Sequence, residues 1–175
     1  MTQPPYPPPP PPASQPGPTA GQPGDMVNRF VAKLVDWVIL VVAIVVITMV
    51  LTLLSFGMST RGYLWDAFTT ILSAAIAIGY FSFLESSRGQ TIGKTVMKMR
   101  VENVAGGLPS MEQALKRNAY MAFSLLGLVP FFGGVLSSLA GLAAMVTIAL
   151  TINSDTVAHR GWHDNFAGTR VIKTD

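Results

Sequence analysis

Three long stretches without a charged residue constrain this chain more than any other feature of its sequence. They cover residues 37–56, 67–84 and 118–154 and are 20, 18 and 37 residues long. A membrane-spanning helix needs about 20 apolar residues to cross a hydrocarbon core of roughly 30 Å, whereas the helices of a soluble bundle carry charges at helical spacing. Charged residues make up only 12% of the chain, against roughly 25% in soluble domains. The sequence therefore predicts an all-α fold, a polytopic transmembrane helical bundle.

The third stretch is too long for a single crossing, because its 37 residues would reach about 55 Å as a helix. The segment GLVPFFGG near its middle, at 127–134, contains one proline and a pair of glycines, which are natural helix breakers. We therefore expect a helical hairpin with legs near 111–129 and 134–153. The first leg is short of apolar residues, so Lys116 and Arg117 are expected to extend toward the interface. This gives about four spans in total.

The distribution of basic residues predicts how the bundle is oriented. With four spans and both termini in the cytoplasm, eleven of the twelve lysines and arginines lie inside and Arg61 alone lies outside. Cytoplasmic segments of membrane proteins carry an excess of Lys and Arg. A three-span arrangement remains the alternative, but it would move the three cations of the C-terminal tail outside. The sequence favours a multi-pass protein of the cytoplasmic (inner) cell membrane, with cytoplasmic N- and C-termini and a lipid bilayer around its helices.

The N-terminal segment differs in composition from the rest of the chain. Residues 1–25 contain eleven of the 13 prolines, so this segment cannot form helices and is expected to be extended and disordered. It serves either as a solvated spacer or as a docking strip for a partner that reads proline-rich sequences. We therefore divide the chain into a disordered proline-rich leader, 1–25, and a transmembrane domain, 26–175.

Two segments outside the apolar stretches predict a small cytoplasmic loop and strand element. The segment 96–109 alternates in polarity and then turns at Ala-Gly-Gly, and the tail segment 167–173 has a similar pattern. Such alternation, bounded by glycines, is typical of short strands joined by turns. We expect the two segments to pair as a small sheet under the helices.

The segment GQTIGKT, at 89–95, resembles a phosphate-binding loop but does not fit one. Gly89 and Gly93 are separated by three residues, whereas a phosphate loop has four residues between its first glycine and the Gly-Lys pair and follows a strand. We therefore expect no nucleotide as a partner. The glycines are expected to let the backbone turn sharply as it leaves the bilayer, and Lys94 is expected to meet a lipid phosphate or a cytoplasmic carboxylate.

Charged residues gather at the predicted cytoplasmic boundary of the bundle. Arg29, Lys33 and Asp36 stand at i, i+4 and i+7, so they share one face of the first helix and can pair there. Asp164 lies just past the last apolar stretch and can reach the same cations or basic residues further along the chain. A carboxylate inside a membrane helix is costly and marks a candidate site. The predicted interfacial charge cluster consists of Arg29, Asp36, Lys94, Arg117 and Asp164.

Residues for enzymatic chemistry are not evident in the sequence. The chain has no cysteine, which excludes disulfides, thiolate metal sites and a cysteine nucleophile. His159 and His163 stand four residues apart but lack a third deeply placed ligand, and the serines have no evident base beside them. We therefore expect no catalytic residue, no metal site, no cofactor and no nucleic acid partner.

Small residues recur four positions apart in the apolar stretches. Such spacing lets membrane helices approach closely, either within one chain or between a chain and a partner. The pairs include Ala75 with Gly79, Gly134 with Ser138, and Ser137 with Gly141.

Three motifs in this order resemble the RDD family of small bacterial membrane proteins, which is named for one arginine and two aspartates. They are RFVAKLVD at the first span, SSRGQTIGKTVMKMRVENVAGGLPSMEQALKR after the second, and HRGWHDNFAGTRVI near the C-terminus. The family arginine then corresponds to Arg29 and its aspartates to Asp36 and Asp164. The leader looks like those of actinobacterial members. Further positions that match the family pattern are Thr91, Gly93, Lys94, Val101, Gly107, Arg117, Ala167, Gly168 and Thr169. The motif glycines are Gly89, Gly93, Gly107 and Gly168.

The resemblance implies a membrane role without a defined reaction. Some members of the family are suggested to move cations or protons, and others look like accessory subunits of larger membrane assemblies, including respiratory ones. We expect a non-enzymatic accessory or scaffold subunit that contacts other integral membrane subunits or a second copy of itself. The alternative is a small cation or proton transporter that uses Asp36 with Arg29. No carboxylate lies near the centre of a predicted span, where transporters usually hold their substrate, so the sequence favours the accessory role.

Overall fold

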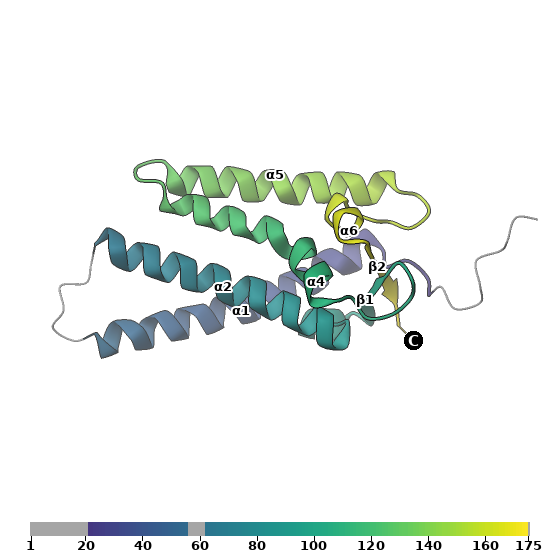
Figure 1. Ribbon diagram of the computed structural model, residues 1–175, viewed down its shortest axis with the longest axis horizontal. Helices are drawn as coiled ribbons and strands as arrows, with labels where there is room; N and C mark the ends of the chain where they lie inside the picture. The colour runs from purple at the N-terminus through teal and green to yellow at the C-terminus, as the bar shows by residue number, and fades with distance from the viewer. Residues whose placement is uncertain (1–20, 56–61, 175) are drawn as a thin grey trace, which may run out of the picture.

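Four long segments lie along the length of the molecule and carry the chain back and forth between its two ends (Figure 1). The computed structural model describes residues 21–55 and 62–174. The long segments are the helices α1 (Met26–Leu54), α2 (Tyr63–Arg88) and α5 (Gly133–Ser154), and the 3-10 helix η1 (Ala119–Leu128). The three α-helices are each long and apolar enough to cross a membrane, so the predicted all-α transmembrane bundle is confirmed.

The short elements gather at one end of the bundle, which we call the polar end (Figure 1). They are α3 (Ile92–Val96), β1 (Met99–Asn103), α4 (Met111–Asn118), α6 (Trp162–Ala167) and β2 (Thr169–Lys173). α1 starts at this end, and α2 and α5 both finish there. The two ends of the described chain therefore lie on the same side of the bundle.

The exposed surface of α1 suits a membrane rather than water. Asp25 caps its N-terminus, where the carboxylate accepts a hydrogen bond from the backbone N–H of Asn28 at 2.8 Å. Only Ala32, Asp36 and Leu40 are buried along the helix, and they form a single stripe at i, i+4 and i+8. Most of the valines and leucines on its other faces are exposed. Water penalises such a surface, whereas lipid hydrocarbon is equally apolar.

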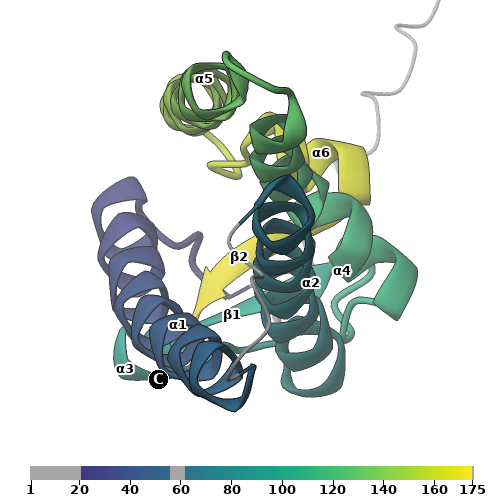
Figure 2. The same cartoon turned by 90° about the vertical axis from the view of Figure 1, so that its left-hand side faces the viewer.

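The predicted helical hairpin is present, but its first leg is not a regular α-helix. α4 is followed directly by η1. A 3-10 helix rises about 2.0 Å per residue, against about 1.5 Å in an α-helix, so the 10 residues of η1 cover about 20 Å. The longer rise compensates for the few apolar residues in this leg. A turn at 129–132 then reverses the chain, and α5 packs along η1 (Figure 2).

The predicted two-stranded element is confirmed at the polar end. β1 and β2 pair antiparallel, with Val101 opposite Val171. These two valines and Met99 are buried against Ala32 of α1. The sheet is thereby fastened to the start of the first long helix.

The segment just before α1 also takes part in this packing. The backbone N–H of Gly24 donates to the carbonyl oxygen of Val171 at 3.0 Å, and Pro23 forms an isolated bridge with Ile172 of β2. Residues 21–25, which the sequence assigned to the leader, therefore extend the packed structure of the domain. The predicted disorder of residues 1–20 lies outside the described part of the chain.

Two of the motif glycines are required by the backbone, for different reasons. Gly89 ends α2 with a φ of 70°, a left-handed conformation that residues with side chains rarely adopt. It turns the chain sharply out of the helix, as predicted. Gly93 allows a close approach instead, because a Cβ at this position would lie 2.0 Å from the carbonyl oxygen of Ala32. α3 can contact α1 only because Gly93 has no side chain.

Replacing Gly93 by alanine is expected to lower the stability of the protein, because the new Cβ would push α3 away from α1. Overpacking of this kind costs about 1–3 kcal/mol, which a thermal unfolding measurement in detergent resolves as a lower Tm. Gly79→Ala is the matched control, because Gly79 lies within α2 and a Cβ there would meet nothing within 4 Å. Equal Tm values for the two variants would contradict this account of Gly93.

Candidate functional site

Five side chains of alternating charge form a buried network at the polar end. In order of contact they are Arg29, Asp164, Arg117, Glu85 and Lys94. They come from α1, α6, α4, α2 and α3 respectively, and none of the five side chains is more than 9% exposed. We call this set the ion-pair chain. It joins five elements, and its paired residues are between 9 and 135 positions apart in the sequence.

Asp164 holds the first half of the ion-pair chain together. Its Oδ2 atom accepts a hydrogen bond from Nη1 of Arg29 at 2.9 Å, and its Oδ1 atom contacts Nη1 of Arg117. The backbone N–H of Gly161 also donates to Oδ2, at 3.2 Å. Burial by itself raises the pKa of Asp164, but the nearby charges of Arg117 and Arg29 and the hydrogen bond from Gly161 outweigh it and lower this pKa below its usual value. Asp164 is therefore ionised at neutral pH.

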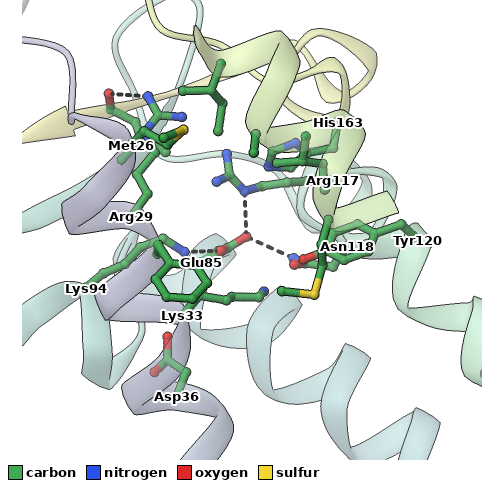
Figure 3. A pocket seen from close by; sticks show the side chains of 16 residues that line it. Met26, Arg29, Lys33, Asp36, Glu85, Lys94, Arg117, Asn118, Tyr120 and His163 are labelled. Atoms are coloured by element: carbon green, nitrogen blue, oxygen red, sulfur yellow. Dashed lines mark hydrogen bonds and ion pairs between the residues drawn. The ribbon is translucent and has the colours of Figure 1, made fainter. Parts of the chain in front are cut away.

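Glu85 holds the second half together, from the last turn of α2 (Figure 3). Its carboxylate contacts Nζ of Lys94, and Nε of Arg117 lies 3.3 Å from Oε2. The side-chain amide of Asn118 donates to the same oxygen at 2.9 Å. Sequence reasoning missed Glu85. It stands one residue past the uncharged stretch 67–84, so the cost of a carboxylate at a membrane boundary, which singled out Asp36, also applies to it.

Asp36 is not part of the ion-pair chain, and the predicted pairing of Asp36 with Arg29 is wrong. Its carboxylate accepts hydrogen bonds from three uncharged donors, which are the hydroxyl of Tyr80 at 2.8 Å, the hydroxyl of Thr91 at 2.6 Å and the backbone N–H of Gly93 at 2.8 Å. The close approach of α3 to α1 brings the last two donors within reach. Arg29 points toward Asp164 and two backbone carbonyls instead.

Lys33 occupies a different environment from the other cations. Its Nζ atom lies 3.3 Å from the centroid of the Phe81 ring and makes no ion pair or hydrogen bond with a side chain of residues 21–55 or 62–174. The ammonium group faces a cavity of about 130 Å³, which we call the cationic pocket (Figure 3). Arg29, Lys94 and Arg117 also line this pocket, together with Glu85 and Asp36.

Further predictions concerned the exposure of Lys116 and Arg117 and the positions of two motif glycines. Arg117 is buried rather than extended toward the interface, because two carboxylates compensate its charge inside the protein; Lys116 does stay exposed. Gly168 ends α6 with a φ of 64°. Gly107 lies in the loop between β1 and α4, where an added Cβ would make only an ordinary contact with Asn103.

In the segment that resembles a phosphate loop, the polar groups bind carboxylates of the protein itself. The hydroxyl of Thr91 and the backbone N–H of Gly93 both bind Asp36, and Lys94 binds Glu85. Of the two partners predicted for Lys94, the structure has the carboxylate. The groups that would otherwise contact a phosphate are thus occupied within the protein.

The two histidines lie apart from any arrangement of three metal ligands in the described residues. His163 is buried against the rings of Tyr120 and Trp162, and its Nε2 atom lies 3.6 Å from Oδ1 of Asp164. Its Nδ1 atom has no hydrogen-bond partner in this part of the chain. Burial lowers the pKa of His163 from 6.5 to about 4, so its imidazole is neutral at neutral pH.

The pKa of His163 predicts a pH dependence of stability. The unfolded chain takes up a proton on His163 near pH 6.5, whereas the folded chain does so only near pH 4. The contribution of His163 to the free energy of unfolding is therefore fully present above pH 6.5 and is lost as the pH falls toward 4. The loss amounts to about 3 kcal/mol.

His163→Gln removes this titration, so its free energy of unfolding is expected to change less between pH 6.5 and pH 4.5 than that of the wild type. Denaturant unfolding in detergent at several pH values measures the difference. His159→Gln serves as the control, because His159 is more exposed than His163 and, unlike His163, is not among the side chains paired with Asp164. Parallel pH profiles for wild type and His163→Gln would contradict the assignment.

Comparison with known proteins identifies one family. The model of the RDD family matches residues 23–168, which is most of the chain. No curated protein and no solved structure is detectably similar to the chain.

Proposed function

The chain belongs to the RDD family, and from this membership we propose that it is a non-enzymatic accessory or scaffold subunit of a larger membrane complex. Its multi-pass bundle would reside in the cytoplasmic (inner) membrane with both termini in the cytoplasm. The observation that carries the proposal is the role of the buried carboxylates, each of which links separate elements of the chain.

Three buried carboxylates at the polar end, those of Asp36, Glu85 and Asp164, connect the helices. Asp36 of α1 binds groups of α2 and α3, Glu85 of α2 binds groups of α3 and α4, and Asp164 of α6 binds groups of α1 and α4. A carboxylate that carries a proton or a cation must exchange partners during transport. One that is bound by several elements mainly stabilises their arrangement, since breaking such a buried pair costs about 3–5 kcal/mol. This supports a structural role for the charges.

The membrane-facing part of the bundle is much less tightly packed than the polar end. A groove of about 690 Å³ opens between α1, α2, η1 and α5, and α1 touches α5 only sparsely. Ser137, Ser138 and Gly141 of α5 line this groove. Small residues of this kind permit close contact with a helix. The groove therefore supports an interaction with another membrane helix.

The small residues also favour an external partner over packing within the chain. A Cβ added at Gly79, Gly134 or Gly141 would meet nothing within 4 Å. If these glycines served close packing between helices of this chain, a neighbouring backbone or side chain would lie against them, as Ala32 does against Gly93. Space at these positions is left for a second chain.

The concentration of cations at the polar end supports the proposed orientation. Arg29, Lys94 and Arg117 lie there, together with the basic residues of the sheet. Cytoplasmic segments are the ones enriched in Lys and Arg. Both described chain ends share this side, so both termini would be cytoplasmic.

The alternative, a small cation or proton transporter that uses Asp36 with Arg29, has less support. It requires the two side chains to pair and separate, yet Arg29 binds Asp164 and Asp36 binds three uncharged donors. The two roles predict different outcomes for a variant of Asp36.

Asp36→Asn is expected to lower the amount of folded protein in the membrane, because the amide nitrogen that replaces one carboxylate oxygen cannot accept. It loses either the bond that Thr91 donates to Oδ2 or, with the amide turned over, those that Tyr80 and Gly93 donate to Oδ1. Losing hydrogen bonds to a charged acceptor costs on the order of 3 kcal/mol. Western blotting of membranes measures abundance, and Asp66→Asn is the control because Asp66 is exposed near the start of α2. Normal abundance of Asp36→Asn, combined with loss of pH-gradient-driven cation flux in reconstituted vesicles, would favour transport instead.

Gly141→Leu tests the proposed interaction directly. The new side chain would fill the groove without a clash inside the chain, so we expect wild-type abundance and Tm but at least a fivefold loss of co-purifying membrane proteins, quantified by mass spectrometry after mild detergent extraction. The control is Ala143→Leu, at an exposed position of α5 outside the groove. If both variants retain the same partners, or if the wild type carries none and is monomeric, the proposal fails.

A further inference from the structure

The cationic pocket has an excess of positive charge. Four cations line it, which are Arg29, Lys33, Lys94 and Arg117, whereas the carboxylates that face it are Glu85 and Asp36. Asp164, which does not line the pocket, compensates Arg29 and shares Arg117 with Glu85. When Asp164 is included, four positive charges face three negative ones. Lys33 is the basic residue of this set whose side chain has no hydrogen-bond acceptor or ion-pair partner in residues 21–55 and 62–174.

The carboxylates that line the pocket do not compete for Lys33. Both oxygens of Glu85 are bound, one by Lys94 and the other by Arg117 and Asn118. Both oxygens of Asp36 are bound by uncharged donors from α2 and α3. Lys33 is half-buried, and an ammonium group partly removed from water without an acceptor is unfavourable. An anion that entered the pocket would therefore supply the acceptor that this part of the chain does not.

The entrance to the pocket is apolar. The lining residues that reach the surface are Met26 and Phe30 of α1 and Met145 of α5, and the half-buried Ile148 of α5 lies beside them. These two helices touch only sparsely, and they lie apart when the bundle is viewed end-on (Figure 2). The opening is therefore directed to the side of the bundle, where acyl chains lie.

The pocket also lies at the depth of lipid head groups. Lys33 stands four residues before the uncharged stretch 37–56, so it is located where α1 passes from the polar end into the hydrocarbon region. A charged floor behind an apolar entrance fits an amphiphile with an anionic head. A small hydrophilic anion would meet only apolar side chains on its way in.

We propose that the cationic pocket binds the phosphate head group of an anionic phospholipid, which enters between α1 and α5 and contacts Lys33. Basic pockets between membrane helices bind lipid head groups in this way. The cavity volume of about 130 Å³ is that of several water molecules, since one water occupies about 30 Å³ in the liquid, and it accommodates a phosphate group. The acyl chains would lie along the apolar faces of α1 and α5.

The test uses the full-length protein in a neutral detergent, titrated with dioleoyl phosphatidylglycerol, dioleoyl phosphatidylcholine or inorganic phosphate. Mass spectrometry of the intact complex and the lipid-induced rise in Tm report binding. We expect phosphatidylglycerol to bind at least tenfold more tightly than the other two ligands. Equal binding of phosphatidylcholine would overturn the preference for an anionic head group, and equal binding of free phosphate would overturn a lipid as the occupant.

Variants of Lys33 locate the site. Lys33→Gln is expected to weaken phosphatidylglycerol binding at least tenfold, whereas Lys33→Arg retains most of it because the positive charge remains. Lys116→Gln makes the same change of charge at an exposed position of α4, where Lys116 pairs with Glu112, and should bind like the wild type. Wild-type binding by Lys33→Gln, or an equal loss in Lys116→Gln, would overturn the assignment.

A steric variant tests the entrance without altering any charge. Ala149 of α5 is half-buried and lines the pocket, so the larger side chain of Ala149→Trp should obstruct the pocket and reduce phosphatidylglycerol binding at least fivefold. Leu150→Trp places the same side chain at a neighbouring exposed position outside the pocket and should have no effect. This comparison decides the question even if Lys33→Gln does not fold, and equal binding by the two tryptophan variants overturns the proposed entrance.

Discussion

Charges that are removed from water hold one end of this bundle together. A buried ion costs several kcal/mol in desolvation, which is offset only when partners of opposite charge and further donors surround it. In this protein those partners arrive on five separate elements, so the carboxylates of Asp164 and Glu85 are satisfied only when α1, α2, α3, α4 and α6 are all in place. Removing any one element leaves uncompensated charges on the others. The polar end is therefore expected to form as a unit.

The membrane-facing part of the bundle is built on a different principle. Lipid hydrocarbon is as apolar as the helices, so no hydrophobic force drives the helices together there. They are accordingly free to stand apart, and the groove and the gap between α1 and α5 remain open. A rigid polar end with loosely packed helices suits a protein that presents membrane-facing surfaces in a constant orientation. The groove and the cationic pocket share Lys33, Tyr120 and Met145 in their linings, so the proposed partner helix and the proposed lipid would occupy adjoining parts of the same open face.

Asp36 shows why a correct helical face does not identify a partner. Arg29 and Asp36 do lie on the same side of α1, as their spacing requires. The missing side chain of Gly93 lets α3 lie against that side, so that uncharged donors reach Asp36 first. Arg29 is then available for Asp164, which lies 135 residues further along the chain. The family pattern of one arginine and two aspartates therefore brings together residues that do not all pair with one another.

Local properties of the chain were sufficient to predict the apolar helices, the break at 127–134, the two short strands and the sharp turn at Gly89. Each depends on residues within a few positions of one another, through hydrophobic length, backbone breakers or strand alternation. The sequence also indicated which charged residues gather at one boundary, because polarity alone excludes them from the hydrocarbon. It did not reveal their pairing, the part played by Glu85, the 3-10 geometry of η1 or the solitary position of Lys33. Those features depend on distances between side chains on different elements, and such distances exist only once α3, α4 and α6 have packed against the long helices.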